Sequence, residues 1–187
     1  VGDAPRTLFY PGSSIGNFEP QDALRFLRDM RVATRGGALL IGVDLVKPLA
    51  VLEPAYADAL GVTAAFNLNL LHHLNRLLGS NFDVTAWRHV AFFNTQASRI
   101  EMHLEATRSQ VVQWPDAAAT PLGTTGTTPA STPQIAQRGF DSGERILTEY
   151  SYKWQPERFQ RLLHDAGFDD VQVWTDPQSW FAVMLAQ

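Results

Sequence analysis

The 187-residue sequence contains no cysteine. That absence excludes disulfide bonds, thiolate metal ligands and a cysteine nucleophile. It fits a reducing compartment, and we therefore expect a cytoplasmic protein. No apolar run approaches the roughly 20 residues that a membrane-spanning helix needs, and the first 15 residues lack the basic and apolar regions of a secretory signal. We therefore expect neither a membrane protein nor a visibly secreted one.

Clusters of lysine and arginine are missing as well. The formal net charge is -4, and without a basic patch the chain lacks the electrostatic footprint of nucleic-acid binding. Nucleic acid is therefore not expected as a partner. Apolar residues, by contrast, are plentiful: they make up 45% of the sequence and include 11 Phe and 5 Trp. We expect a folded domain, or part of a larger one, with a substantial core.

Several catalytic motifs are also absent. The sequence has no Gly-x-Ser-x-Gly elbow and no Walker-type loop, so acyl and phosphoryl transfer lack their usual motifs. The histidines raise the question of a metal site. His72 and His73 are adjacent on a predicted helix and therefore point about 100° apart, while His89 and His103 match no ligand spacing. We expect no metal site.

The first 48 residues predict a strand, a helix and a second strand. Residues 6–10 favour a short buried strand that runs into the turn Gly-Ser-Ser-Ile-Gly-Asn at 12–17. The apolar run at 38–46 suits a strand that is buried on both faces. The intervening segment has the length of a parallel βαβ crossover. The turn would then lie at the carboxyl edge of an α/β sheet, where ligands bind.

The middle of the chain has a different pattern. Residues 49–60 and 63–78 predict two helices, and the second has an apolar stripe. Three strand-like runs at 87–94, 99–106 and 110–114 then indicate an antiparallel insertion. The residues of the helical stripe are Phe66, Leu70, Leu74 and Leu77.

The last part of the chain alternates between strands and a helix. Ala117 to Pro133 is rich in Thr, Gly and Pro and predicts a flexible loop. A strand at 145–151 and a helix at 156–166 follow. Two final strands, at 171–175 and 181–185, are joined by a connection short enough for an antiparallel hairpin.

Two polar residues near position 150 suit recognition of an imidazole ring. Glu149 and Ser151 stand two apart on a predicted strand, so both point to one face together with Leu147. The carboxylate can accept the ring N–H, and the hydroxyl can donate to or accept from the other nitrogen. The alternative is an edge-strand face open to water, and the residues alone favour it.

Asn17, at the end of the Gly-rich turn, suits an amino-acid ligand. Its amide can accept from an ammonium group and donate to a carboxylate, which are the two ends of an amino acid. The alternative is an N-cap role for the helix that follows, since Asn is among the best N-cap residues. The two roles are compatible.

Four segments carry a resemblance to a known family. They are Gly12-Ser-Ser-Ile-Gly-Asn17, the stretch from Ala55 to Asn67, Arg99-Ile-Glu-Met102 and the stretch from Gly143 to Ser151. Together they resemble the histidine-specific Nα-methyltransferases of ergothioneine biosynthesis. The resemblance runs through nearly the whole chain, apart from the Thr/Pro-rich loop. These enzymes trimethylate the α-amino group of L-histidine.

The resemblance implies a set of substrate-binding residues. They are Gly12, Asn17, Tyr56, Met102, Glu149 and Ser151. Glu149 and Ser151 would bind the imidazole, with Met102 walling its pocket. Asn17 and Tyr56 would hold the amino-acid end, and Gly12 would let the ligand approach the backbone. Without the resemblance, Gly12 is explained by tight turning, Tyr56 by a half-buried helix surface and Met102 by core filling.

The implied fold class is α/β. The chain would supply the later strands of a Rossmann-like class I methyltransferase sheet, ending in an antiparallel hairpin, with an inserted α+β substrate-binding domain. Residues 1–48 and 143–187 would belong to the methyltransferase core. Residues 49–142 would form the inserted region, with a flexible loop at 115–139.

S-adenosylmethionine is the implied cofactor. Its sites resemble other Rossmann-type sites in using a Gly-rich loop after the first strand and an acidic residue at the end of the second. We find no such pair, so we expect no cofactor-binding residue here and place those segments upstream of Val1. The chain would then be the carboxyl-terminal portion of a longer protein and inactive alone. Its unpaired sheet edge would invite self-association.

Two other interpretations remain open. The protein could be a catalytically inactive module that binds an amino acid or a protein. Alternatively, it could be a methyltransferase that acts on another amino acid or amine.

Overall fold

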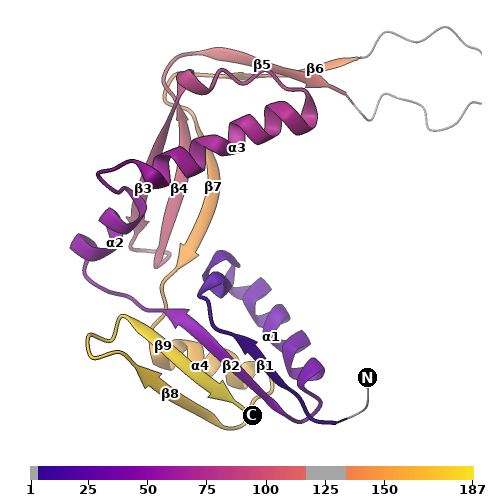
Figure 1. Ribbon diagram of the computed structural model, residues 1–187, viewed down its shortest axis with the longest axis vertical. Helices are drawn as coiled ribbons and strands as arrows, with labels where there is room; N and C mark the ends of the chain where they lie inside the picture. Colours follow the sequence, from indigo (N-terminus) through magenta and orange to yellow (C-terminus); the bar gives the residue numbers. More distant parts are fainter. Residues whose placement is uncertain (1–3, 117–133) are drawn as a thin grey trace, which may run out of the picture. The chain divides into compact units, whose positions relative to one another are not determined.

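The computed structural model describes residues 4–116 and 134–187 and shows a mixed α/β protein (Figure 1). The loop predicted over 117–133 lies outside these residues. The chain forms two compact units. The first comprises Val1–Tyr56, Ala91–Glu101 and Glu149–Gln187, and the second comprises Ala57–Val90 and Met102–Thr148. The domain boundaries expected from the sequence stay a prediction.

A four-stranded sheet with the order β1-β2-β9-β8 forms the centre of the first unit. β1 (Thr7–Tyr10) pairs in parallel with β2 (Ala38–Asp44), as the predicted strand–helix–strand unit requires. β9 (Phe181–Ala186) runs antiparallel to both β2 and β8 (Val171–Thr175). The predicted parallel pair and the predicted terminal hairpin are therefore both confirmed.

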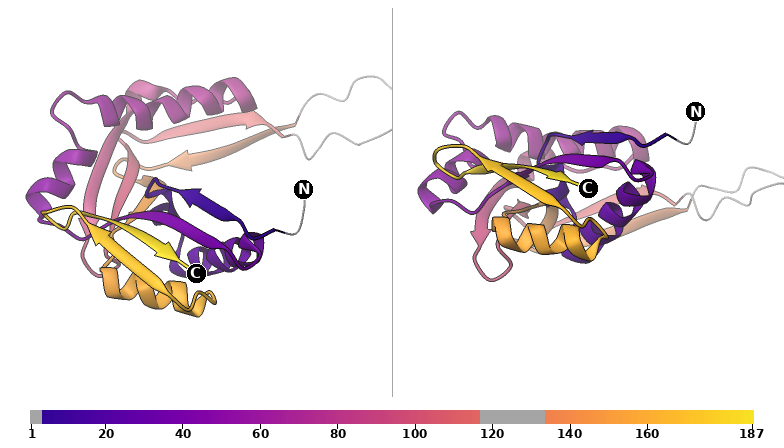
Figure 2. Two further views of the ribbon diagram at one scale, coloured as in Figure 1. Left: turned by 60° about the horizontal axis from the view of Figure 1, so that its bottom comes forward. Right: turned by 90° about the horizontal axis from the view of Figure 1, so that it is seen from below.

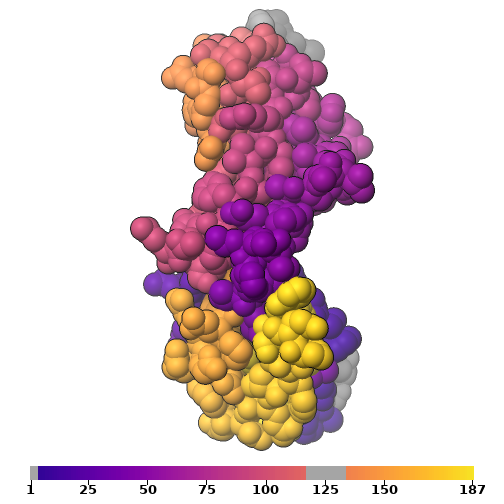
Figure 3. All heavy atoms as spheres, turned by 90° about the vertical axis from the view of Figure 1, so that its left-hand side faces the viewer, coloured from indigo at the N-terminus to yellow at the C-terminus, as the bar shows by residue number. Residues whose placement is uncertain are grey.

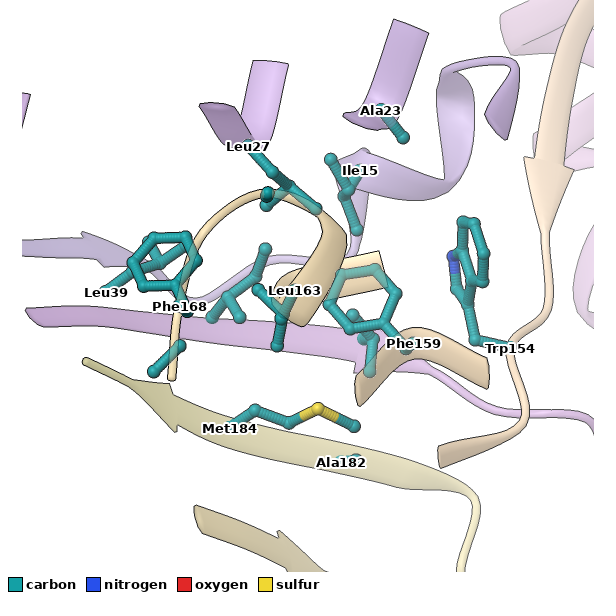
Figure 4. Close-up of a cluster of buried hydrophobic side chains, with 14 of the residues drawn as sticks. Ile15, Ala23, Leu27, Leu39, Trp154, Phe159, Leu163, Phe168, Ala182 and Met184 are labelled. Carbon is teal, nitrogen blue, oxygen red and sulfur yellow. The ribbon is translucent and has the colours of Figure 1, made fainter. Parts of the chain in front are cut away.

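Two helices cover one face of this sheet. α1 (Pro20–Thr34) and α4 (Pro156–Asp165) each begin with a proline in the first turn and turn an apolar stripe toward the strands. Figure 2 shows both helices on the same side of the sheet. Figure 4 shows the core that they enclose, which includes Leu27, Leu39, Phe159, Leu163 and Met184.

The other face of the sheet is open among the described residues. Phe9 of β1 is 70% exposed and Trp174 of β8 is 51% exposed, whereas Leu8 and Val173 pack on the core. The expectation of a buried strand at 6–10 is therefore wrong for every second residue, because successive side chains of a strand point to opposite faces. Figure 3 shows the β8–β9 hairpin beside α4 on the surface of this unit.

The second unit is built on α3 (Val62–Leu78) and a β-ribbon of β5 (Gln110–Pro115) and β6 (Ile135–Phe140). A short 3-10 helix, η2 (Val84–Ala86), leads into a three-stranded sheet with the order β3-β4-β7. Its strands are β3 (Trp87–Asn94), β4 (Arg99–Ala106) and β7 (Arg145–Tyr152), and each has residues in both units. Among the described residues, no helix is both long and apolar enough to cross a membrane.

The apolar stripe predicted for the helix over 63–78 is wrong as a buried face for three of its four residues, and only Leu74 among the four packs against the core. Phe66 and Leu77 are 67% and 72% exposed, and Leu70 is exposed as well, whereas Leu71 is only 1% exposed. The helix turns Asn67 inward instead, because the Asn67 amide donates to the carbonyl of His103 and bonds the ring of His89. The helix carries leucines on more than one side, so periodicity alone could not choose the buried face.

The loop expected over 115–139 is partly a strand. Residues 135–139 belong to β6, which pairs antiparallel with β5 from Pro115 to Gln110. Its sequence, Ile-Ala-Gln-Arg-Gly-Phe, has no regular alternation of apolar residues. The strand was therefore not visible from its pattern. Similarly, the helix expected over 49–60 ends at Tyr56 as α2 (Leu49–Tyr56).

Asp58 caps the first turn of α3 and gives a pH-dependent contribution to stability. Its two carboxylate oxygens accept the backbone N–H groups of Val62 and Thr63, at 2.9 and 2.8 Å. These bonds, that of Thr63 first, lower the pKa of Asp58 from 3.8 to about 2. The contribution is therefore complete above pH 3.8 and is lost as the pH falls toward 2. We expect Asp58→Asn to flatten the fall in melting temperature over that range.

A matched control for this experiment lies on α1. Asp29 is exposed and accepts no hydrogen bond from any residue in the described ranges. Thermal melts between pH 5 and pH 2 should show the wild-type slope for Asp29→Asn. An equal slope in both variants would contradict the capping role.

Candidate functional site

The candidate site lies in the first unit, where the parallel strands β1 and β2 end. β1 leads into the 3-10 turn η1 (Ser14–Asn17), and the chain beyond β2 enters α2 (Leu49–Tyr56). The end of β7 joins the same region: Leu45 and Trp154 form a parallel bridge, and the N–H of Trp154 donates to the carbonyl of Asp44. Ligands of α/β proteins bind at such carboxyl ends of strands.

A buried lysine organises this region. The Lys153 ammonium, whose side chain is 0% exposed, donates to the Tyr56 hydroxyl and the Ser151 hydroxyl, both at 2.7 Å. It also pairs with Asp44 at 2.8 Å. The two hydroxyls bond each other at 2.8 Å, and the second oxygen of Asp44 binds Lys47 at 2.5 Å. We call these five residues the Lys153 cluster.

The backbone fixes Lys153 on both sides. Its N–H donates to the carbonyl of Ser98 at 2.8 Å, and the Ser98 hydroxyl donates back to the carbonyl of Lys153 at 2.9 Å. Ser98 ends the turn between β3 and β4 and has a positive φ of 54°. The lysine is therefore held by main-chain contacts as well as by its side chain.

Glu149 lies two residues before Ser151 on β7 and is half-buried. Burial raises the pKa of its carboxyl above the ordinary value, and the positive charge of Lys153 works against that shift. Its carboxylate has no hydrogen-bond partner among the described residues. A partly desolvated carboxylate without a partner is suited to accept a hydrogen bond from a ligand.

The turn that carries Asn17 is packed directly on β7. A Cβ added to Gly16 would lie 2.8 Å from the carbonyl oxygen of Tyr152, so the two backbones touch. Beyond the turn, Glu19 accepts from the Tyr152 hydroxyl at 2.6 Å and pairs with Arg99 at 2.9 Å. Burial, and then the bond to Glu19, raise the pKa of Tyr152, which keeps this phenol protonated as a donor. The close approach at Gly16 and the contacts of Glu19 together place the turn beside Tyr152, the residue that follows Ser151.

Asn17 and Gly12 both remain open to a ligand. Asn17 is exposed, and its amide makes no hydrogen bond to a described residue. The N-cap alternative is wrong, because α1 begins at Pro20 with Glu19 at its N-cap. Gly12 does not have a positive φ, and a Cβ there would meet nothing within 4 Å. The turn at Gly12 therefore does not use the left-handed backbone conformation that favours glycine.

Met102 belongs to the second unit, where its side chain is 4% exposed and its carbonyl accepts from the Thr148 hydroxyl at 3.0 Å. The structure thus brings Tyr56 and Ser151 into contact and places Glu149, Asn17 and Gly12 in the same unit. The role of Met102 in an imidazole pocket stays a prediction. Within the described ranges, no three His, Asp or Glu side chains are grouped so that they could hold a metal ion.

The sequence reasoning missed Lys153 and Asp44. A signal for Lys153 was present, because it continues the alternation of Glu149 and Ser151 along the chain. A second signal is composition: the sequence has only two lysines, Lys47 and Lys153, and both pair with Asp44. Asp44 itself had no such signal, because its partners come from distant segments.

Polar side chains at the carboxyl ends of the strands are the arrangement in which many α/β proteins bind small molecules. Comparison with known proteins narrows this class. The chain belongs to the family of histidine-specific, S-adenosylmethionine-dependent methyltransferases, whose sequence profile matches residues 2–187. The resemblance seen in the four sequence segments is thereby confirmed.

Individual relatives agree with this assignment. The chain is 40% identical over 182 residues to histidine N-alpha-methyltransferase of Mycolicibacterium smegmatis and 39% identical to that of Mycobacterium tuberculosis. Each match covers 97% of this chain and 51% of the relative. Ergothioneine biosynthesis protein 1 of Neurospora crassa is 28% identical, over 97% of this chain and 19% of its own length. The chain thus spans about half the length of the mycobacterial relatives.

The Gly-rich turn after β1 and the acidic residue at the end of β2 do not match the Rossmann-type cofactor cradle. Gly16 is already packed against the backbone of Tyr152. Asp44, the acidic residue at the end of β2, already binds Lys47 and Lys153 through its two oxygens. Neither residue is therefore placed to receive the ribose of a nucleoside cofactor.

Proposed function

We propose that this chain is the substrate-binding portion of an S-adenosylmethionine-dependent enzyme that methylates the α-amino group of L-histidine, as in formation of trimethylhistidine for ergothioneine. The observation that carries the proposal is that Glu149, half-buried and without a hydrogen-bond partner among the described residues, lies two residues from Ser151 on β7. A carboxylate and a hydroxyl at this spacing match the two nitrogens of an imidazole. The family membership supports the same substrate.

The other site residues divide between the two ends of the substrate. Asn17 and the Tyr56 hydroxyl would hold the amino and carboxylate groups, since both can donate and accept. Gly12 would let the ligand lie close to the backbone, because nothing else occupies the space beside it. Met102 would wall the imidazole pocket, as in the family pattern.

The chemistry demands little of the chain beyond positioning. S-adenosylmethionine supplies an activated methyl group when it is bound. The residues of this chain would hold the amine deprotonated and in line for a direct displacement, and would exclude water. We infer that β1, β2 and the terminal hairpin are the later strands of a class I methyltransferase sheet, into which residues 49–142 are inserted.

The alternative that the sequence left open is a module that binds histidine without methylating it. Titration calorimetry of the full-length protein with L-histidine, followed by mass spectrometry after addition of S-adenosylmethionine, separates the two. We expect histidine to bind, tryptophan and methylated histidine to bind more weakly, and methyl transfer to follow. Binding without transfer would favour the module, and equal affinity for tryptophan would favour another substrate.

Residues 1–187 alone should differ from the full-length protein in cofactor binding and in activity. We expect residues 1–187 alone neither to bind S-adenosylmethionine with micromolar affinity nor to turn over. Calorimetry of this chain with the cofactor measures the first point directly. Micromolar binding would contradict the expectation that these residues contain no cofactor cradle.

A further inference from the structure

Arg99 begins one of the four segments that carry the family resemblance, but the proposed function gives it no role. It lies in the first unit, and its side chain is only 16% exposed. Its Nε donates to Glu101 at 2.8 Å, and its Nη1 donates both to Glu19 at 2.9 Å and to the Tyr152 hydroxyl at 2.7 Å. Tyr152 in turn donates to the other oxygen of Glu19 at 2.6 Å. Arg99, Glu19 and Tyr152 therefore form a closed triangle of hydrogen bonds.

One corner of this triangle is attached to the turn that carries Asn17. Glu19 follows Asn17 by two residues and is the N-cap residue of α1, where its side chain makes no capping hydrogen bond to a described residue. Its carboxylate instead binds Arg99 and Tyr152. Glu101 already balances the charge of Arg99, and the Glu19 side chain is 46% exposed, so neither charge requires this contact for compensation. The contact instead fixes the end of the turn.

The other two corners hold β7. Tyr152 lies on this strand, and so does Tyr150, whose ring stacks on the Arg99 guanidinium with 3.7 Å between the guanidinium carbon and the ring centroid. Successive side chains of a strand point to opposite faces. Both tyrosines therefore lie on the face of β7 opposite to Glu149 and Ser151. Arg99 thus contacts β7 from behind the face that is proposed to bind the substrate.

We propose that Arg99 is a positioning residue that holds Asn17 at a fixed distance from the imidazole-binding residues of β7. This inference rests on the proposed function, in which Asn17 holds the amino-acid end of the substrate and β7 binds its ring. Both ends belong to one small molecule, so the two groups of contacts must lie a set distance apart. A displacement of the turn by about 1 Å would take Asn17 out of hydrogen-bonding distance while the ring remained bound.

The variant Glu19→Ala cuts this tie while Arg99 stays paired with Glu101. In calorimetry of the full-length protein, we expect it to weaken the binding of L-histidine about tenfold. The binding of 4-methylimidazole, which has the ring but no amino-acid end, should be unchanged in an NMR titration. Arg99→Met should act in the same way, and Glu19→Gln, which keeps an acceptor oxygen, should retain most of the affinity. General damage to the fold would weaken both ligands alike.

A double-mutant cycle identifies the residue through which the effect passes. If Glu19 acts by placing Asn17, then Glu19→Ala should cost little further affinity for L-histidine in the Asn17→Ala background. Asp22→Ala is the matched control. It removes a carboxylate from the same first turn of α1, where Asp22 pairs with Arg25 of the same helix. We expect this control to bind L-histidine with wild-type affinity.

Hydrogen exchange supplies a measurement that needs no ligand. The N–H groups of Gly16 and Phe18 are both bonded within the turn. Mass spectrometry of the full-length protein should show them exchanging several times faster in Glu19→Ala, because the turn is no longer tied to β7. The Asp22→Ala control should exchange at the wild-type rate. Equal rates in the two variants would overturn the positioning role.

The outcomes separate this inference from the proposed function. If the wild-type protein does not bind L-histidine, the proposed function is wrong, and the exchange rates still decide whether the triangle fixes the turn. If it binds, unchanged affinity in Glu19→Ala or equal losses for L-histidine and 4-methylimidazole would overturn only the positioning role. Losses that multiply in the cycle with Asn17→Ala would overturn it as well.

Discussion

Replacing Glu149 with alanine weakens the binding of L-histidine about tenfold or more, if Glu149 accepts the imidazole N–H as proposed. The carboxylate is half-buried and has no hydrogen-bond partner among the described residues, so its oxygens are available to the ring N–H. The substrate N–H would be left in a partly desolvated site without an acceptor. Calorimetry of the full-length protein measures this loss.

Two further variants make the Glu149 experiment specific. Glu149→Gln keeps one acceptor oxygen and should lose less affinity than Glu149→Ala. Glu157→Ala removes an exposed carboxylate from the first turn of α4, outside the site, and should leave the affinity unchanged. Unchanged affinity after Glu149→Ala would refute the assignment of Glu149 to the imidazole.

Gly42→Ala should destabilise the chain by roughly 3 kcal/mol or more, at the upper end of overpacking effects. A Cβ on Gly42 would lie 2.2 Å from the carbonyl oxygen of Pro11 and 2.7 Å from the ring of Phe181. The Phe181 ring can rotate, but the Pro11 carbonyl is part of the backbone between β1 and the Gly-rich turn. β2 is an inner strand, so it cannot shift without disturbing both neighbours. Urea denaturation of residues 1–187 measures the change.

Gly139→Ala is the control for this substitution. Gly139 also lies in a strand, but a Cβ there would meet nothing within 4 Å and its φ is not positive. We expect its effect to stay within about 0.5 kcal/mol, as for most surface substitutions. Equal denaturation midpoints for Gly42→Ala and Gly139→Ala would show that the contact with Pro11 is not a constraint on the fold.

The hydrophobic periodicity of the sequence was sufficient to predict most of the helices and strands of the first unit. α1 and α4 have one clear apolar stripe each, and β2 is a continuous apolar run between two breakers. Periodicity was insufficient to identify the buried face of α3. Leucines occur on several sides of this helix, and the burial of Asn67 depends on partners distant in sequence. β6 was missed because its residues are held mainly by pairing with β5, which leaves little apolar pattern.

The candidate site was predictable in part. The two-residue spacing of Glu149 and Ser151 placed them on one face of a strand, and the family resemblance added Tyr56, which the structure brings into contact with Ser151. The partners of Lys153 could not be predicted. Asp44 lies on β2 and Tyr56 on α2, and the bridge between Leu45 and Trp154, which brings the end of β2 to the lysine, joins segments far apart in the sequence.

Because the sequence has so few lysines, chemical labelling of their amines can probe the ends of the strands. The side-chain amines of the sequence are confined to Lys47 and Lys153, and both sit on the same carboxylate. An amine-reactive label can therefore modify only this locality and the terminal amino group of the chain. The Lys47 side chain is 13% exposed, whereas the Lys153 side chain is 0% exposed. The labelling rate of Lys153 therefore reports how often the strand ends open to solvent.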